Sequence, residues 1–147
     1  VADPRALRVA LDAWDVQSRL GSPEGELALA QALVYLASAP KSTAVYRAYK
    51  SACDAVQNYP VEAVPLHLRN APTGLMKSMG YGDEYRYAHD YPDGFAAGES
   101  YLPESLAELT LYEPSNRGLE IRIGDKLKRL HRANAESQFQ RYRSAVK

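Results

Sequence analysis

The residues best able to bind a metal ion lie in one short stretch of the chain. His89 and Asp90 are followed by Asp93 and preceded by Glu84, and carboxylate oxygens suit a hard cation. Adjacent residues point apart unless the backbone bends around the ion, and the other two histidines are distant in the sequence. A metal site needs three or four converging ligands, so we expect none. We expect His89 and Asp90 to hold their loop by hydrogen bonds instead.

Nucleophilic catalysis has no better candidate. Cys53, the single cysteine, falls within a predicted helix among apolar neighbours, where cysteine usually serves as a small hydrophobic residue. Ser100 and Ser115 lack the sharp turn that exposes a nucleophilic serine. The chain also contains neither a Gly-x-x-x-x-Gly-Lys-Ser/Thr loop nor a Gly-x-Gly-x-x-Gly motif. We therefore expect no catalytic, metal-binding or cofactor-binding residue in this chain.

Charge is balanced overall but unevenly distributed. Residues 61–117 carry four basic and nine acidic side chains, whereas residues 118–147 carry eight basic and three acidic ones. The basic end could contact DNA, and its candidate residues are Arg122, Lys126, Lys128, Arg129 and Arg132. The alternative is a solvated helix face that pairs with the acidic middle segment of its own or a neighbouring chain.

The first 60 residues predict three helices. Asp3 and Pro4 suit a helix start, and the apolar residues that follow recur at helical spacing up to the stop at Gly21. Residues 27–39 are apolar almost all round, which is typical of a helix at the centre of a bundle. A third helix should begin after Ser42 and end before Pro60. Short turns between three helices predict an antiparallel array.

The pattern changes after residue 60. We expect an extended segment over 64–68, a short helix over 72–79, an irregular segment over 81–117 with one short helix near 102–109, and a long helix from about 115 to 136. Six of the 11 tyrosines lie between residues 81 and 112, and we expect their rings to be buried. Residues 137–147 lack periodicity and are expected to fray.

These features define the fold class. The 147 residues, 46% hydrophobic and 24% charged, have the composition of a globular protein. No run of 18 apolar residues exists, so we expect no membrane association through a spanning helix. The fold class is therefore all-α: a helical bundle followed by an irregular tyrosine-rich segment and a long C-terminal helix. The expected domains are residues 1–58 and residues 59–147, and the start Val-Ala-Asp-Pro-Arg suggests a piece of a longer protein.

Several long strings of the sequence resemble the C-terminal part of the RarA/MgsA family of AAA+ ATPases. They occur in order over nearly the whole chain, which makes them more specific than a short spaced motif. The matching strings are Ala30–Tyr46, Pro65–Lys77, Gly80–Asp90, Ala96–Pro103, Arg117–Leu127 and Gln140–Arg143.

This resemblance implies a function. The longer protein would be a clamp-loader-related ATPase that acts in DNA replication, recombination and repair at stalled forks, with ATP and Mg²⁺ bound upstream of this chain. Residues 1–58 would form a collar-like helical domain and residues 59–147 the family's C-terminal extension, and together they would hold a homotetramer. DNA and the single-strand DNA-binding protein are implied partners, and the implied location is the cytoplasm, in association with the nucleoid.

The resemblance also directs attention to an interface. Interfaces of obligate homomers are large and apolar at their centre. Leucine, methionine and tyrosine residues cluster between positions 66 and 81, and we expect them to form that centre. The candidate interface residues are Leu66, Leu68, Leu75, Met76, Met79 and Tyr81. DNA contact or partner docking by the basic C-terminal helix remains the alternative function.

Overall fold

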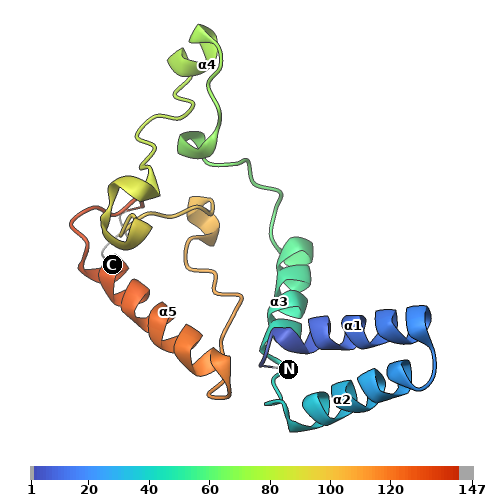
Figure 1. Ribbon diagram of the computed structural model, residues 1–147. Helices are drawn as coiled ribbons and strands as arrows, with labels where there is room; N and C mark the ends of the chain where they lie inside the picture. The colour runs from blue at the N-terminus through green and yellow to red at the C-terminus, as the bar shows by residue number, and fades with distance from the viewer. Residues whose placement is uncertain (1, 143–147) are drawn as a thin grey trace. The chain divides into compact units, whose positions relative to one another are not determined.

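The computed structural model describes residues 2–142 and confirms the all-α prediction, since these residues contain helices and no strand (Figure 1). Arg143, the last residue of the matching strings, lies outside the described residues. The α-helices of the described residues are α1 (Arg5–Leu20), α2 (Glu24–Ser38), α3 (Ala44–Asn58), α4 (Gly74–Ser78) and α5 (Leu119–Glu136). Single turns of 3₁₀-helix occur at η1 (Leu66–Leu68), η2 (Ala88–Asp90), η3 (Pro92–Gly94) and η4 (Glu104–Leu106).

Short polar residues precede three of the helices, and two of these residues, Asp3 and Ser42, are the ones that the sequence predicts. The Oδ1 atom of Asp3 accepts a hydrogen bond from the backbone N–H of Arg5 at 3.0 Å, and the hydroxyl of Ser42 accepts one from Ala44 N at 3.1 Å. Thr73 Oγ1 accepts from Met76 N at 3.2 Å. Each bond satisfies a backbone donor that a helix leaves unpaired in its first turn. The α4 helix is shorter than predicted, and α5 begins at Leu119 rather than near residue 115.

The chain forms two compact units. One contains residues 2–52 with 111–126, and the other contains residues 53–110 with 127–142. We refer to them as unit 1 and unit 2. The domain boundary between residues 58 and 59 stays a prediction.

Unit 1 is built on an antiparallel hairpin of α1 and α2 (Figure 1). Gly21, with φ +69°, connects the helices, in a conformation that favours glycine. The two backbones approach closely at Gly25, where an added Cβ atom would lie 2.6 Å from the Cα atom of Gln17. The structure contains only two helices of the predicted antiparallel array, α1 and α2, because α3 packs on neither of them.

The buried apolar residues of the described chain are small. All of those with high burial are alanines, namely Ala2, Ala6, Ala13, Ala32, Ala39, Ala44 and Ala96. Among the described residues no large apolar side chain belongs to this well-buried set. Leu7, Leu11 and Trp14 recur at helical spacing as expected, yet the side chain of Trp14 is 70% exposed. Within unit 1, the described residues therefore do not enclose α2 as predicted.

The prediction that the tyrosine rings of residues 81–112 are buried is wrong for part of the set. Tyr85, Tyr87 and Tyr101 are each about half exposed. Tyrosine is amphipathic and forms contacts in a core and at a surface equally well, so residue type alone does not distinguish the two positions.

We predict that Gly25→Ala destabilises unit 1. The new methyl group meets the Gln17 backbone, which cannot move aside without displacing α1, and overpacking of this kind costs about 1–3 kcal/mol. Urea unfolding followed by circular dichroism measures the change in the free energy of unfolding. Gly74→Ala is the matched control, because an added Cβ there meets nothing within 4 Å. Equal stabilities of the two variants would contradict the close approach at Gly25.

Candidate interaction surfaces

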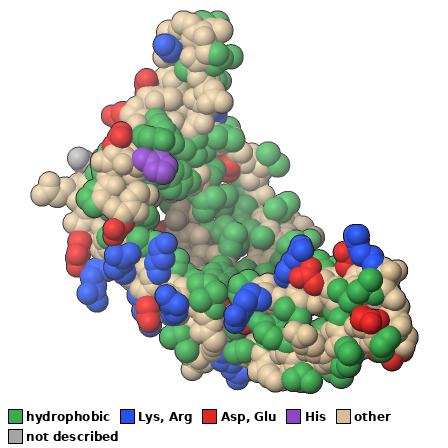
Figure 2. All heavy atoms as spheres, in the orientation of Figure 1, with side chains coloured by type: hydrophobic (Ala, Val, Ile, Leu, Met, Phe, Trp, Pro, Cys, Tyr) green, Lys and Arg blue, Asp and Glu red, His purple; other side chains and the backbone are tan. Residues whose placement is uncertain are grey.

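The first candidate surface is the outside of the α1–α2 hairpin in unit 1. From Leu27 to Ser38, α2 contains no charged residue, and large apolar side chains lie on several of its faces. Those exposed on α2 are Leu27, Leu29, Leu33 and Val34, and those exposed on α1 are Leu7, Leu11, Trp14 and Leu20. Figure 2 shows hydrophobic side chains over this hairpin, interrupted by separate acidic and basic groups. Because exposed apolar patches are typical of interaction sites, this hairpin is a candidate interaction surface.

The second candidate surface is an arm formed by residues 61–84 of unit 2, which carries α4 at its end (Figure 1). The base of the arm is closed by a hydrogen bond from Gly82 N to the carbonyl oxygen of Leu66, at 2.9 Å. Arg69 braces the same region: its Nε donates to Val64 O at 2.6 Å and its Nη1 to the Tyr81 hydroxyl at 3.3 Å. Its guanidinium also stacks on the Tyr81 ring, 5.1 Å from the ring centroid.

The arm carries all six predicted interface residues. Leu66, Leu75 and Met79 are exposed, whereas Leu68, Met76 and Tyr81 are half-buried and help to hold the arm together. The structure thus brings these residues onto one local element. Their contact with another chain stays a prediction.

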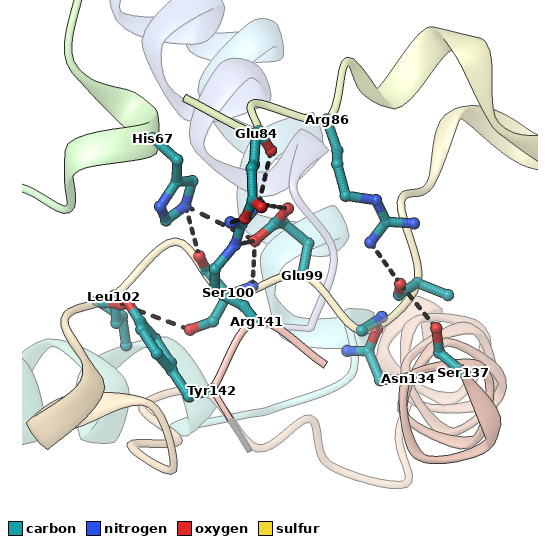
Figure 3. Close-up of polar contacts among 12 residues, drawn as sticks. His67, Glu84, Arg86, Glu99, Ser100, Leu102, Asn134, Ser137, Arg141 and Tyr142 are labelled. Carbon is teal, nitrogen blue, oxygen red and sulfur yellow. Dashed lines mark hydrogen bonds and ion pairs between the residues drawn. The ribbon is translucent and has the colours of Figure 1, made fainter. Parts of the chain in front are cut away.

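A buried ion pair fastens the C-terminal segment of unit 2 to the tyrosine-rich loop (Figure 3). The side chain of Glu99 is 1% exposed and accepts two hydrogen bonds from Arg141, from Nε at 2.6 Å and from Nη2 at 2.8 Å. The Nη2 atom of Arg141 also donates to Glu84 O at 2.8 Å. His67 Nε2 donates to Ser100 O at 3.0 Å and lies 3.6 Å from the Glu99 carboxylate. Two parallel bonds between guanidinium and carboxylate are a strong form of ion pair.

Burial alone raises the pKa of Glu99. The hydrogen bonds from Arg141 and from the backbone N–H of Ser100 outweigh this effect, so the pKa of Glu99 lies below its ordinary value. The hydrogen bonds to Glu99 likewise raise the pKa of Arg141. The pair is therefore fully charged near neutral pH.

Further bonds hold the residues around Gly98 against the end of the chain. Gly98 N donates to Asn134 Oδ1 at 2.9 Å, Ser137 Oγ donates to Ala97 O at 3.0 Å, and Arg141 N donates to Gly98 O at 3.0 Å. A Cβ atom at Gly98 would lie 1.8 Å from Phe139 O. The prediction that the chain frays after residue 136 is therefore wrong for residues 137–142, because long-range bonds replace the missing periodicity.

A buried carboxylate has a similar role in unit 1. Glu120, in the first turn of α5, is 4% exposed. It accepts hydrogen bonds from Ser42 Oγ and from Ser115 N, both at 2.8 Å. Burial raises the pKa of Glu120, but hydrogen bonds from Ser115, Ser42 and Tyr112 hold this pKa below its ordinary value. The carboxylate thus ties the start of α5 to the segment that precedes α3.

The predicted DNA-contact residues all lie on α5. Arg122, Lys126, Lys128, Arg129 and Arg132 are exposed. Their spacing places them on two adjoining stripes of the helix. Arg129 Nη1 pairs with Asp93 Oδ2 at 2.9 Å, which agrees with the alternative of pairing with the acidic middle segment for this one residue.

Neither a metal site nor a membrane-spanning helix is found among the described residues. No group of three or more His, Cys, Asp or Glu side chains among residues 2–142 converges closely enough to hold a metal ion. His89 is exposed, and its ring lies 5.0 Å from that of Tyr87. No helix in this part of the chain is long and apolar enough to cross a membrane.

Comparison with known sequences shows which proteins this chain is similar to. Residues 1–131 match the family described as "MgsA AAA+ ATPase C terminal". The chain is 56% identical over 142 residues to replication-associated recombination protein A of Escherichia coli K12, with 97% of this chain and 32% of that protein covered. The protein of the same name from Coxiella burnetii is 59% identical over 135 residues (92% and 31% covered), and that from Bacillus subtilis is 31% identical over 118 residues (80% and 28% covered). The chain thus spans about a third of the length of these relatives.

Sequence reasoning missed Glu99, Arg141 and Glu120 as organising residues. Each is one charged residue among many, and the paired groups are 42 residues apart for Glu99 and Arg141 and 78 apart for Ser42 and Glu120. Hydrophobic periodicity does not report on polar contacts of this range. The available signal was that all three residues lie in strings that resemble the family, Ala96–Pro103, Arg117–Leu127 and Gln140–Arg143.

We predict that Glu99→Gln lowers stability at pH 7 by about 3 kcal/mol, because it leaves the guanidinium of Arg141 without its buried carboxylate. Since the pKa of Glu99 is lower in the folded state, its contribution is present above the unfolded pKa of about 4.3 and is lost as pH falls through the folded pKa. The unfolding free energies of variant and native chain should therefore converge on acidification.

Urea unfolding between pH 7 and pH 3 measures both effects. Glu84→Gln is the control, because the carboxylate of Glu84 is 80% exposed and exposed ion pairs contribute about 0–1 kcal/mol. A constant difference between the Glu99→Gln variant and the native chain at every pH would show that Glu99 is not the titrating group.

Proposed function

Because the chain belongs to the family of MgsA AAA+ ATPase C-terminal domains, we propose that it is a non-catalytic oligomerisation module. It holds copies of a longer ATPase together as a homotetramer. The longer protein acts in DNA replication, recombination and repair at stalled forks, and ATP and Mg²⁺ bind in its part outside this chain. We place it in the cytoplasm, in association with the nucleoid.

The observation that carries this proposal is the uncovered apolar surface of α2. A helix that is apolar on every face is normally enclosed by other elements, yet Leu33 is 69% exposed and Val34 is 66% exposed. Burial of one such side chain stabilises a protein by about 1.5–3 kcal/mol. The other described residues of unit 1 leave this surface exposed, and we propose that it is covered when copies of the chain assemble.

A second copy is the occupant that we favour. Most soluble oligomers are closed assemblies of identical chains, and the arm offers a second apolar surface in Leu66, Leu75 and Met79. Linking four copies also raises the effective concentration of any weak DNA contact made by each copy. Tetramerisation is therefore a direct way for this chain to increase the DNA affinity of the whole protein.

We predict a mass near four chains for the purified protein, about 65 kDa, or four times 16.3 kDa. Because the interface is apolar, this mass should resist high salt. Leu33→Glu should yield monomers, since it places a charge in the apolar contact. Sedimentation velocity over a range of concentration and salt measures the mass.

Ser51→Glu is the control for the added charge. Ser51 is exposed on α3, and on a helical projection it lies away from the apolar stripe of Val45 and Val56. This variant should keep the mass of the native chain. A native chain that is monomeric at every concentration would contradict the proposal and transfer the tetramer contacts to the rest of the longer protein.

The second candidate function is DNA contact by α5. The five exposed cations on this helix support it, because clustered lysine and arginine side chains bind phosphate and release counterions. We also propose the single-strand DNA-binding protein as a partner. No residue of this chain is assigned to that contact.

We predict that Lys126→Glu weakens binding to single-stranded DNA of any sequence and makes the salt dependence of the affinity shallower by about one ion or more. Fluorescence anisotropy with a labelled oligonucleotide, at salt concentrations from about 50 to 200 mM, measures this slope. Lys50→Glu on α3 is the control with the same charge change. If Lys126→Glu alters the mass of the protein instead, Lys126 belongs to the oligomer interface.

A further inference from the structure

Unit 2 contains a pocket of about 250 Å³ between the loop that follows Tyr85 and the C-terminal half of α5. Its wall is mostly apolar, and two guanidinium groups and the carboxylate of Asp93 border it. The residues that define its chemistry are Arg86, Tyr91, Phe95, Arg129, Leu130 and Ala133. A pocket of this kind accepts one large apolar side chain and favours a carboxylate beside it.

Hydrogen bonds and ring stacking within the chain hold the wall of the pocket in place. Arg86 Nε donates to the Tyr91 hydroxyl at 3.0 Å and Nη1 donates to Ala97 O at 2.8 Å. Its guanidinium also stacks on two rings, with centroids at 4.5 Å for Tyr91 and 4.1 Å for Phe139. Arg86 is therefore a fixed part of the pocket, and binding there costs little ordering of the wall.

Arg129 is the more accessible cation of the pocket. Its side chain is 64% exposed, and its partner Asp93 is 67% exposed. An exposed pair of this kind contributes little to stability. Because a guanidinium has five N–H donors, Arg129 can bind a second carboxylate while it keeps Asp93.

The segment from Leu75, in α4, to Asp83, beside the base of the arm, has the complementary chemistry. Leu75 is 71% exposed and Met79 is 55% exposed. The backbone N–H of Asp83 donates to Gly80 O at 3.3 Å, and the Asp83 Oδ2 atom lies 3.5 Å from the position of a Cβ atom on Gly80. The flexible side chain of Met79 and the exposed carboxylate of Asp83 are therefore close neighbours on the arm.

The arm end and the pocket of one copy do not meet. Figure 1 shows α4 at the far end of the arm, away from η2, η3 and α5, the elements beside the pocket. The bonds from Gly82 to Leu66 and from Arg69 to Val64 keep the arm closed at its base. A second copy can bring the two surfaces together without breaking these bonds.

We propose that Met79 of one copy inserts into the pocket of the next copy, with Asp83 paired to Arg129 across the interface. This contact rests on the proposed oligomerisation and assigns it a specific pair of surfaces. It joins two different surfaces, so it is a heterologous contact, and four such contacts can close a tetramer. The exposed Leu75 covers the apolar border of the pocket beside Met79.

Charge reversal tests this pairing, because a heterologous contact lets two defective variants complement each other. Asp83→Arg places two cations together in the contact, and Arg129→Asp places two carboxylates together. Like charges in an interface are strongly unfavourable, so we expect each variant alone to associate at least about tenfold more weakly than the native chain. Sedimentation velocity on the purified protein measures the association.

An equimolar mixture of the two variants should associate again. Each arm then finds a pocket of opposite charge on the other variant, and the two chains alternate. A single chain that carries both Asp83→Arg and Arg129→Asp should also associate with itself. Recovery in the mixture shows in addition that both variants are folded, so loss of association in the single variants is not a folding defect.

A matched pair of exposed charges outside the contact provides the control. Asp54→Arg and Arg47→Asp, both on α3, carry the same charge changes at exposed positions, and both variants should associate like the native chain. Met79→Ala should weaken association without changing its response to the charge reversals.

The failure of this inference is distinguishable from failure of the proposed function. If the native chain and both single variants assemble equally well, the arm and pocket do not pair, and the contacts of α2 support the oligomer. If the native chain assembles but the mixture and the double variant stay as weak as the single variants, Asp83 and Arg129 do not pair with each other. If the native chain is monomeric at all concentrations, both the oligomerisation and this pairing are wrong.

Discussion

The burial of alanine rather than leucine is the constraint on which the rest of this structure depends. A buried alanine removes little apolar area from water, whereas a buried leucine or phenylalanine contributes about 1.5–3 kcal/mol. Among the described residues only alanines form the well-buried apolar set, and the long side chains of α1 and α2 face outward. The helices approach closely, as at Gly25 and Gln17, but the larger part of the available hydrophobic stabilisation is left for contacts with another surface.

Buried polar groups compensate locally for this small core. Arg141 and Glu99 fasten residues 137–142 to the tyrosine-rich loop of unit 2, and Glu120 joins the start of α5 to Ser42 in unit 1. Such pairs specify one arrangement more than they add net stability, because removing charges from water is costly. They hold loops to distant segments of the chain, while the bonds of Arg69 and Arg86 keep the arm and the pocket in defined shapes.

Buried polar contacts that fix the loops, together with exposed apolar side chains, are the features expected of a chain that forms an oligomer. Surfaces that are shaped in advance lose little conformational freedom on binding, and the apolar side chains left exposed supply the gain in free energy. The chain belongs to the MgsA AAA+ ATPase C-terminal family, and in the tetramer proposed above the linked copies would act together on one DNA. In this view the arm determines which surfaces meet, and α2 contributes most of the buried area.

The sequence by itself determined the all-α class, the positions of the five helices and their caps at Asp3 and Ser42, because these depend on residues within three or four positions of each other. It also placed six candidate interface residues on what proved to be one arm. Only the tertiary structure decided which apolar faces stay uncovered, that Tyr85 and Tyr101 are exposed, and that Glu99 meets Arg141 beside His67. The physical reason is the separation of the contacting residues along the sequence. Helical periodicity depends on neighbouring residues, whereas a buried ion pair or a pocket depends on contacts between distant segments.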